Sequence, residues 1–414
     1  MPPNVALHIC CLTRITLAHD VKGGMEVHIK TLAEGLVTRG MRVSVVTTAH
    51  PDDRECVEEG GVHYYFVSHT RPGKYSHAWG QSSLDVLKAL HARDPIDLIW
   101  GEGAGAYYYI KFGKKFLGVP VVTNLQGTFS GELRTQWESC HQRQQVRRFF
   151  FQHLPWRTVQ YFRWDWYFVR GADAIISPSN ENAAAARRDY GLRREKVCAS
   201  VNGIDVALFH PDRAAGRLTR QRYGLCQKLV LFTCARLEPE KGVDLLLAAV
   251  QRLVPEYAHL HLLVAGHGSH RPQLAVIAQQ RNIMDHVTFL EHVPNPELPA
   301  FYNACDIFVY PTLSWESFGI AVAEAMACGK PVVAARMGGI PTSVEHGQHG
   351  FLYAPRDVGA LTHHLATLLS DGQMRERFGL AAREKAVARL SSQRMVDDAL
   401  GVFSRVLGED KTAG

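Results

Sequence analysis

The hydrophobic and polar positions of this chain follow two patterns that alternate from one end to the other. Short, continuous apolar runs such as VALHICCL, KLVLFTCAR and LHLLVAG are typical of strands buried on both faces. Longer segments lie between them, and their apolar residues recur at helical spacing. Strands that alternate with helices predict an α/β fold of doubly wound parallel sheets with helices on both faces.

Apolar runs predict five strands in each half of the chain. In the first half they are residues 5–12, 43–48, 96–100, 120–126 and 173–179, and in the second half 228–236, 260–266, 287–293, 306–311 and 331–336. At 414 residues the chain exceeds the usual size of a single core, which favours two domains of about 200 residues each. The segment HPDRAAG interrupts the periodicity, so we predict domains at 1–208 and 209–390, followed by a terminal helix within 391–414.

Two helices are clearly marked by their apolar positions. The first follows Gly23 and Gly24, ends near Gly40, and has the apolar face Ile29, Leu32, Ala33, Leu36 and Val37. The second follows Ser391 and Ser392, which are suitable caps, and has the apolar stripe Met395, Val396, Ala399, Leu400, Phe403, Val406 and Leu407.

Composition places the chain among ordinary globular proteins. Charged residues make up 21% and hydrophobic residues 46%. A net charge of +6 without a recognition motif argues against a nucleic-acid partner. The start, MPPNVALHICCLTR, does not read as a signal peptide, and no apolar run reaches membrane-spanning length, so we expect a cytoplasmic protein.

The nine cysteines do not indicate a disulfide framework or a structural metal site. The count is odd, and no CxxC pair or zinc-type histidine spacing occurs. Cys10, Cys11, Cys234, Cys305 and Cys328 lie in apolar runs and are expected to be small core residues. We therefore expect no metal and no cofactor.

The stretch PTLSWESFGIAVAEAMACGKPVV, residues 311–333, contains the strongest chemical signal. Glu324 falls within a helix of small apolar residues, where a carboxylate needs hydrogen-bond donors such as the two hydroxyls of a ribose. Glu316 lies in the preceding loop, and Phe318 and Gly319 lead into a helix N-terminus that favours phosphate. The alternative interpretation places Glu324 on a solvent-facing stripe and makes Glu316 an ordinary N-terminal charge.

A second candidate site is ARLEPEKG, which follows a predicted strand. Arg236 offers a planar fork and Lys241 a compact charge, and two cations at the carboxyl end of a parallel strand can hold a diphosphate. The alternative is an ordinary surface loop with two cations. Gly23 and Gly24 allow close backbone approach to a phosphate, or else form a simple tight turn.

The chain resembles the retaining glycosyltransferases of family 4, the glycosyl transferases group 1, in several blocks that follow the family's order. They are GGMEVHIKTLAEGLVTRGMRVSVVTT, VNGIDVALFHP, ARLEPEKG, VAGHGSH, ESFGIAVAEAMACGKPVV and GGIPTSVEHGQHGFLY. The resemblance implies the GT-B fold, in which two Rossmann-like domains face a central cleft and the last helix crosses back to the first domain. It also implies that the first domain binds the acceptor and the second the nucleotide sugar.

The resemblance also implies roles for individual residues. Arg236 and Lys241 would stabilise the leaving diphosphate, Glu316 would orient the sugar hydroxyls, and Glu324 would bind the ribose. Further donor-binding positions would be Gly23, Gly24, Gln126, Gly266, Phe318 and Gly319. Gln126 stands where the family usually has a histidine that contacts the donor sugar. The chain has no Asp-x-Asp motif, and this absence agrees with the metal-independent activity that the resemblance implies.

The expected function is the transfer of a hexose or N-acetylhexosamine from a nucleoside diphosphate sugar, with retention of configuration. UDP is the preferred nucleotide, with GDP and ADP kept open, and the acceptor is a hydroxyl of a saccharide, a lipid-linked glycan or a small metabolite. The alternative is a noncatalytic partner protein that binds a sugar nucleotide, an interpretation suggested by Gln126.

Residues 141–170 form the most individual segment. The segment contains six arginines and a single acid, Asp165, and ten aromatic residues are interleaved with the arginines. One hypothesis is peripheral contact with the inner membrane face, where an anionic lipid surface presents the acceptor. The other is a helical hairpin that packs its aromatic residues inside the first domain and leaves its arginines outside.

Overall fold

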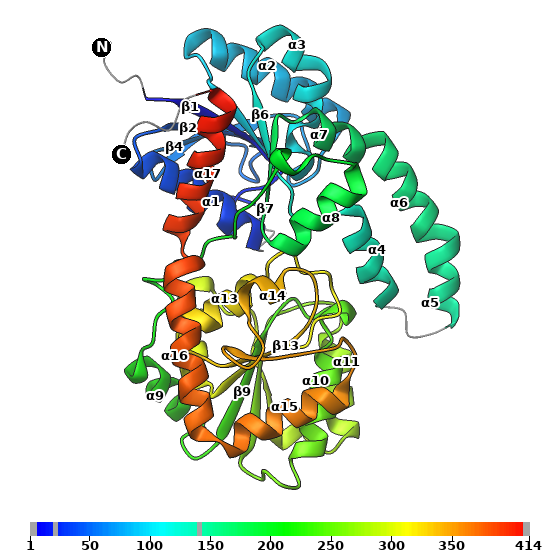
Figure 1. Cartoon of the computed structure of the whole chain (residues 1–414), viewed down its shortest axis with the longest axis vertical. Coiled ribbons are helices and arrows are strands. Elements are labelled where there is room, and N and C mark those ends of the chain that lie inside the picture. The colour runs from blue at the N-terminus through cyan, green and yellow to red at the C-terminus, as the bar shows by residue number, and fades with distance from the viewer. Residues whose placement is uncertain (1–5, 20–23, 139–142, 409–414) are drawn as a thin grey trace. The chain divides into compact units, whose positions relative to one another are not determined.

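The computed structural model describes residues 6–19, 24–138 and 143–408, and the chain divides into two compact units (Figure 1). Unit 1 contains Met1–Ser130, Phe150–Gly203 and Ser392–Gly414, and unit 2 contains Gly131–Phe149 and Ile204–Ser391. The predicted domain boundaries at residues 208 and 390 stay predictions. Each unit is built around its own sheet.

The sheet of unit 1 has the strand order β3-β4-β2-β1-β5-β6-β7-β8. Its strands are β1 (His8–Leu12), β2 (Arg42–Thr48), β3 (Cys56–Glu59), β4 (Val62–Val67), β5 (Leu98–Glu102), β6 (Val121–Asn124), β7 (Ala174–Ser177) and β8 (Val197–Ala199). Neighbouring strands are parallel except for β3 and β4. The strand order reverses between β1 and β5, which makes this position the switch point of the sheet.

Three strands of unit 1 were not predicted, and their sequences explain why. β3 is an exposed, antiparallel edge strand that contains Glu58 and Glu59, and such an edge strand lacks a continuous apolar run. β4 has a mixed pattern because His63 is exposed beside buried Val62 and Tyr64. β8 has only three residues. A prediction based on fully buried runs therefore found the central strands and missed these three.

The helices of unit 1 include three π-helical turns. Its helices are α1 (Gly24–Thr38), α2 (His77–Arg93), α3 (Lys114–Leu117), α6 (Leu154–Gln160), α7 (Trp166–Gly171), α8 (Asn180–Tyr190) and α17 (Ser392–Leu407), and the π turns are η2 (Tyr109–Gly113), η3 (Phe149–His153) and η4 (Tyr161–Asp165). Ser76 and Ser179 cap α2 and α8 by accepting from backbone N–H groups.

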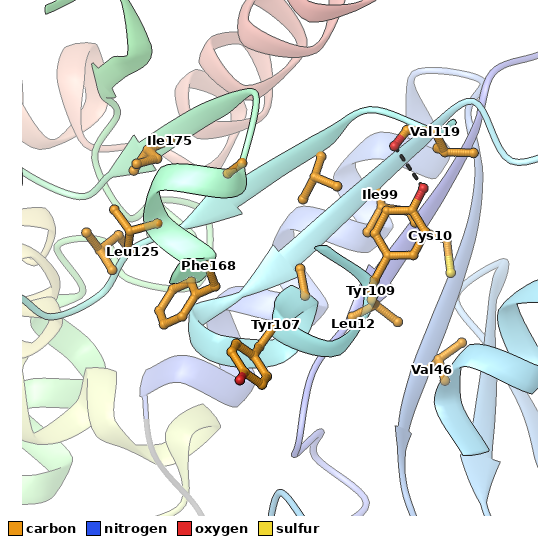
Figure 2. Close-up of a cluster of buried hydrophobic side chains, with 14 of the residues drawn as sticks. Cys10, Leu12, Val46, Ile99, Tyr107, Tyr109, Val119, Leu125, Phe168 and Ile175 are labelled. Atoms are coloured by element: carbon orange, nitrogen blue, oxygen red, sulfur yellow. Dashed lines mark hydrogen bonds between the residues drawn. The ribbon is translucent and has the colours of Figure 1, made fainter. Parts of the chain in front are cut away.

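The sheet of unit 1 is buried on both faces. Successive residues of β1 belong to different clusters, with Cys10 and Leu12 on one face and Ile9 and Cys11 on the other. Figure 2 shows the first cluster, in which the hydroxyl of Tyr109 donates to the Val119 carbonyl at 2.9 Å. Burial on both faces explains the continuous apolar runs that predicted a doubly wound fold.

The last helix packs on the first helix of unit 1, which agrees with the return to the first domain that the family resemblance implied. The buried residues of α17 are Met395, Val396, Ala399, Val402 and Phe403. A β-carbon at Gly35 of α1 would lie 2.3 Å from Val396 Cγ2, so only glycine allows this close approach. The chain thus leaves unit 1 and returns to it at its end.

Unit 2 contains a six-stranded parallel sheet with the order β11-β10-β9-β12-β13-β14. Its strands are β9 (Leu229–Cys234), β10 (Leu260–Ala265), β11 (Val287–Phe289), β12 (Ile307–Tyr310), β13 (Val332–Ala335) and β14 (Gly350–Tyr353). Numbered along the chain the order is 3-2-1-4-5-6, which is the classic Rossmann order with its switch point between β9 and β12. The predicted class, two doubly wound α/β sheets, is confirmed.

The helices of unit 2 lie before, between and after these strands. They are α9 (Arg213–Arg222), α10 (Val243–Leu253), α11 (Arg271–Gln280), α12 (Leu298–Ala304), α13 (Ile320–Ala327), α14 (Ile340–Ser343), α15 (Val358–Ser370) and α16 (Gly372–Arg389). Unit 2 also includes α5 (Arg143–Arg148) and most of α4 (Phe129–Glu138), where Thr135 accepts from the Trp315 backbone N–H at 2.7 Å.

We expect Phe403→Ala to destabilise the protein by about 3–5 kcal/mol, because it empties a fully buried aromatic position where α17 packs on unit 1. Urea unfolding followed by tryptophan fluorescence measures the change. Val387→Ala is the control, since Val387 on α16 is 44% exposed and its truncation should cost less than about 0.5 kcal/mol. Equal losses for the two variants would contradict this account of the packing.

Candidate functional site

Several predicted site residues follow the two strands that flank the switch point of unit 2. Arg236 comes two residues after β9, and Lys241 ends the short 3-10 turn η6 (Pro239–Lys241) before α10. Glu316 and Gly319 lie between β12 and α13. β9 and β12 are parallel neighbours, so both loops leave the same edge of the sheet, where ligands bind in folds of this type.

Lys241 and Glu316 form an ion pair across this edge. The Lys241 Nζ lies 2.5 Å from Glu316 Oε1, and the two side chains are only 10% and 15% exposed. Thr312 donates to the same oxygen at 3.1 Å. The sequence and its family resemblance predict that Lys241 contacts phosphate and that Glu316 contacts sugar hydroxyls. The structure adds that the two residues are direct partners.

Tyr310, at the end of β12, supports Glu316 from the sheet. Burial and the neighbouring Glu316 raise the pKa of its phenol well above the ordinary value, so the hydroxyl stays protonated as a donor to Glu316. Neither Thr312 nor Tyr310 was predicted as a site residue. Thr312 lies in the conspicuous 311–333 stretch and could have been found, whereas the role of Tyr310 depends on the strand placing it beside Glu316.

Arg236 differs from Lys241 in its environment. Its side chain is 63% exposed, and its ion pair with Glu240 is long, with 3.9 Å between Arg236 Nη2 and Glu240 Oε1. A contact of this kind in water contributes little stability. Arg236 is therefore an exposed cation at this edge, in contrast to Lys241, which is buried and closely paired with Glu316.

Gly319 places the start of α13 at the same edge. Its φ of +88° favours glycine, and it serves as the N-cap of the helix. The first N–H groups of a helix have no partner within it and favour an anion. Phe318, the residue before it, is 1% exposed and belongs to the core, and its predicted contact with the donor stays a prediction.

Glu324 lies inside α13 and is 6% exposed, as expected for a carboxylate surrounded by small apolar residues. Tyr302 donates to Glu324 Oε2 at 2.8 Å. Burial raises the pKa of Glu324 to about 7, while hydrogen bonds from Tyr302 and Asn295 act in the opposite direction. The protein itself thus supplies donors that the sequence led us to expect from a ribose, and the solvent-facing interpretation of Glu324 is wrong.

Gly266 follows β10 and allows two loops to approach closely. Its φ is +131°, and a β-carbon there would lie 1.9 Å from the carbonyl oxygen of Ala235. Ala235 directly precedes Arg236. Gly266 therefore has a clear structural role in fixing the backbone beside Arg236, and its predicted contact with the donor stays a prediction.

Two predicted donor-binding residues lie in unit 1. Gly24 is the first residue of the 15-residue helix α1, and Gly23 lies outside the described residues. Gln126 follows β6 and pairs with Asn202, whose Nδ2 donates to Gln126 Oε1 at 3.0 Å. The Gln126 Nε2 donates to Glu102 Oε1 at 3.1 Å. The carboxamide of Gln126 is thus oriented by neighbours on both sides.

A buried polar network that was not predicted from the sequence lies behind Gln126. Glu102 ends β5 and accepts from Trp100 at 3.2 Å and from Asn124 at 3.1 Å. Burial raises the pKa of Glu102 to about 8, while the hydrogen bonds from Gln126, Asn124 and Trp100 act to lower it. His28 of α1 lies 3.9 Å from the Glu102 carboxylate, and burial lowers the pKa of this histidine to about 4. The strand predicted at residues 96–100 ends two residues before Glu102, so the prediction did not include this carboxyl group.

The described residues contain no cluster of three or more metal-ligating side chains. None of the helices in this part of the chain has the length and apolar character needed to cross a membrane. Eight described cysteines are free thiols, and Cys10, Cys11, Cys305 and Cys328 are buried as expected, while Cys234 is half-buried.

Comparisons with known protein families identify the family of this chain. The family described as "Glycosyl transferases group 1" matches residues 219–385, and "Glycosyltransferase Family 4" matches residues 22–208. The chain is 30% identical to D-inositol 3-phosphate glycosyltransferase from Thermomonospora curvata, over 92% of this chain and 90% of the relative. The chain belongs to glycosyltransferase family 4.

Further similarities agree with this family. The match to GDP-mannose-dependent alpha-(1-6)-phosphatidylinositol monomannoside mannosyltransferase from Mycolicibacterium smegmatis is 36% identical but spans only 45% of this glycosyltransferase and half of the relative. Sucrose-phosphate synthase from Thermosynechococcus elongatus has a TM-score of 0.81 at 20% identity, over 97% of this chain and 99% of that one. Anabaena HepE, solved with UDP and glucose, has a TM-score of 0.73 at 22% identity, over 96% and 100%. These structures show that the fold is GT-B.

We expect Glu324→Gln to remove a pH-dependent loss of stability. The folded-state pKa of about 7 exceeds the ordinary 4.5, so the folded glycosyltransferase keeps a proton that the unfolded chain releases. The contribution of Glu324 to stability therefore falls as the pH rises from 4.5 to 7. Urea unfolding across this range should show a smaller decline for the variant than for the wild type. Glu256→Gln on an exposed turn is the control, and parallel curves for all three proteins would rule out the assigned protonation.

Proposed function

We propose that this glycosyltransferase transfers a hexose or an N-acetylhexosamine from a nucleoside diphosphate sugar to an acceptor hydroxyl, with retention of anomeric configuration. The observation that supports this reaction best is the buried Lys241–Glu316 pair at the switch point of unit 2. It combines a fixed cation and a carboxylate next to the start of α13, which suits a ligand with both phosphates and hydroxyls.

The cations act on the leaving group. When the bond between the anomeric carbon and the diphosphate breaks, negative charge grows on the phosphate oxygens. Lys241 would stabilise this charge from a fixed position, and the exposed Arg236 would close on the diphosphate when the donor binds. The N–H groups around Gly319 would add donors that are already oriented.

The acceptor oxygen then forms the new bond to the anomeric carbon. For retention, it would attack from the face that the phosphate leaves, and the departing phosphate oxygen would take the proton of the acceptor hydroxyl. Glu316 would orient the sugar hydroxyls and balance the positive charge that develops on the sugar. This role differs from the acid and base pair of a glycosidase.

Two further residues would hold the donor. Glu324 would bind the ribose through its carboxyl group, of which Oε2 already accepts from Tyr302, and Gln126 would hydrogen-bond a sugar hydroxyl. A carboxamide can donate and accept but does not titrate, so Gln126 would position the sugar without a charge. Its hydrogen bonds to Glu102 and Asn202 would keep it in one orientation.

The proposal also specifies which nucleotide sugars and which acceptors should be tested first. UDP is our preferred nucleotide, with GDP and ADP retained as alternatives, and the name of the Mycolicibacterium relative supports testing GDP-mannose. The names of both curated relatives contain an inositol phosphate or a phosphatidylinositol glycan. We therefore place phosphorylated inositols and lipid-linked saccharides first among the acceptors, with peripheral membrane contact through residues 141–170 as the route to a lipid-linked one.

A donor panel tests the proposed reaction. Purified protein is incubated with UDP-, GDP- and ADP-sugars without added metal, and release of nucleoside diphosphate is measured with and without inositol 3-phosphate. We expect release from one donor, faster with the matching acceptor. If no donor is hydrolysed with any acceptor, while calorimetry shows a sugar nucleotide to bind, a noncatalytic binding protein replaces the enzyme in this proposal.

We expect Lys241→Ala to lower kcat by about 10²–10³-fold, because it removes the fixed charge that faces the leaving diphosphate. Lys241→Arg should restore part of the rate, and Arg252→Ala on the exposed face of α10 should leave it unchanged. Circular dichroism checks that each variant is folded. Near-normal turnover of Lys241→Ala at saturating donor would refute the role of Lys241.

A further inference from the structure

We propose that unit 1 carries a surface that docks onto an anionic lipid bilayer, and that this surface is formed by two separate parts of the chain. One part is the helical arm α6–η4–α7, and the other is η2–α3, which connects β5 to β6. We call this surface the platform. It consists of Lys111, Phe112, Lys115, Phe116, Trp156, Val159, Phe162, Arg163, Trp164, Tyr167 and Arg170.

Exposed aromatic rings in the described residues are confined to one region of the sequence. All the phenylalanine, tryptophan and tyrosine side chains in the exposed class lie between Phe112 and Tyr167. Phe116 is 72% exposed, Phe162 66% and Trp156 62%. Single exposed apolar residues are normal, but a concentration of this kind marks a surface that binds another apolar phase.

The helical arm has the reverse of the usual arrangement for a surface helix. Arg157 and Asp165 form an ion pair with an Nη2–Oδ2 distance of 3.0 Å, and these two residues are only 4% and 8% exposed. On the same helix Trp156, Val159 and Phe162 face out. Burying the charges while exposing the aromatic rings costs free energy in water. The arrangement becomes favourable where the outer face meets lipid.

This finding corrects the alternative hypothesis for residues 141–170. A hairpin with aromatic residues inside and arginines outside fits part of the segment, since Tyr161 and Phe168 are buried while Arg163 and Arg170 are exposed. It does not fit the rest, because Trp156 and Phe162 are exposed and Arg157 is buried in an ion pair. Neither hypothesis for residues 141–170 includes η2–α3, whose Phe112 and Phe116 are exposed as well.

Lys111 joins the two parts of the platform. Its Nζ lies 5.2 Å from the ring centre of Phe112 in η2 and 5.8 Å from that of Tyr167 in α7. Tyr107 and Tyr167 also meet edge to face, with 6.0 Å between ring centres. The aromatic surface is therefore continuous across the two elements.

Charge on the platform selects an anionic partner. Residues 107–117 and 150–171 contain six cations, which are Lys111, Lys114, Lys115, Arg157, Arg163 and Arg170, and one acid, Asp165. Lys114 pairs with Asp173, and Arg157 pairs with Asp165. The other four cations lie over aromatic rings of the same two elements, at 4.7–5.8 Å from the ring centres.

These four cations are exposed, and no acid within the two stretches opposes them. Long cationic side chains that lie along apolar groups can extend their charges to lipid headgroups while the rings enter the interface. Polybasic groups of this kind bind the anionic cytoplasmic leaflet. An apolar contact between two proteins would not require four exposed cations that pair with no acid of the two stretches, so the charge pattern favours lipid over a second copy of the chain.

Two kinds of vesicle test the proposal, with no sugar donor present, so that the result does not depend on the transfer reaction. One contains phosphatidylcholine alone, and the other also contains phosphatidylglycerol. In flotation experiments we expect the wild-type protein to bind the anionic vesicles, to bind the neutral vesicles weakly, and to dissociate as salt increases.

The variants separate the apolar part of the platform from its charges. We expect Trp156→Ser with Phe162→Ser to weaken binding at least about 100-fold, and Lys111→Gln with Arg163→Gln to weaken it about 20-fold and to reduce its salt dependence. The matched control is Leu218→Ser with Leu380→Ser, since these two exposed leucines of unit 2 are 66% and 68% exposed. The control should bind as the wild type does.

Three results would overturn the proposal. The first is wild-type protein that does not float with anionic vesicles, and the second is equal binding by the platform variants and the control. The third is a wild-type dimer that Trp156→Ser with Phe162→Ser converts to monomers in gel filtration without any effect on vesicle binding. That result would assign the aromatic surface to a second copy of the chain. Thermal melting confirms that each variant is folded.

Discussion

The reversal of strand order in the unit 2 sheet is the constraint on which the candidate site depends. Crossover connections in parallel sheets are right-handed, so the chain winds in one direction from β9 to β11 and in the other from β12 to β14. The loops after β9 and β12 therefore diverge at the edge where both strands end. Lys241 and Glu316 are 75 residues apart in sequence and reach hydrogen-bond distance only because of this reversal.

Local signals explain which parts of the site could be predicted. Glu324 was placed in a helix because small apolar residues surround it, and Glu316 and Gly319 were placed before that helix for the same reason. The partners of these residues were not predictable, because Tyr302 and Lys241 come from other parts of the chain. In the fold, buried central strands gave clear apolar runs, whereas the exposed edge strand β3 and the three-residue strand β8 gave none.

Each unit places a carboxyl group with little solvent exposure near the carboxyl end of a strand, but the two groups are in different electrostatic states. In unit 1, His28 and Glu102 are 3.9 Å apart, a distance that suggests an ion pair. The histidine pKa of about 4 and the glutamate pKa of about 8 make both groups neutral between these values. Hydrogen bonds from Trp100, Asn124 and Gln126, rather than charge, therefore hold Glu102. In unit 2, a true ion pair is maintained by Lys241.

The same reasoning separates the buried ion pair of the helical arm from that of the candidate site. Lys241 and Glu316 lie at a sheet edge where a polar ligand can exchange partners with them, so their burial is compatible with a chemical role. Arg157 and Asp165 face inward from a helix whose other face is aromatic and exposed. Replacing a buried ion pair with apolar residues is often neutral or stabilising, so stability alone gives no reason to keep charges inside and rings outside. An interface with lipid on the outer face supplies that reason.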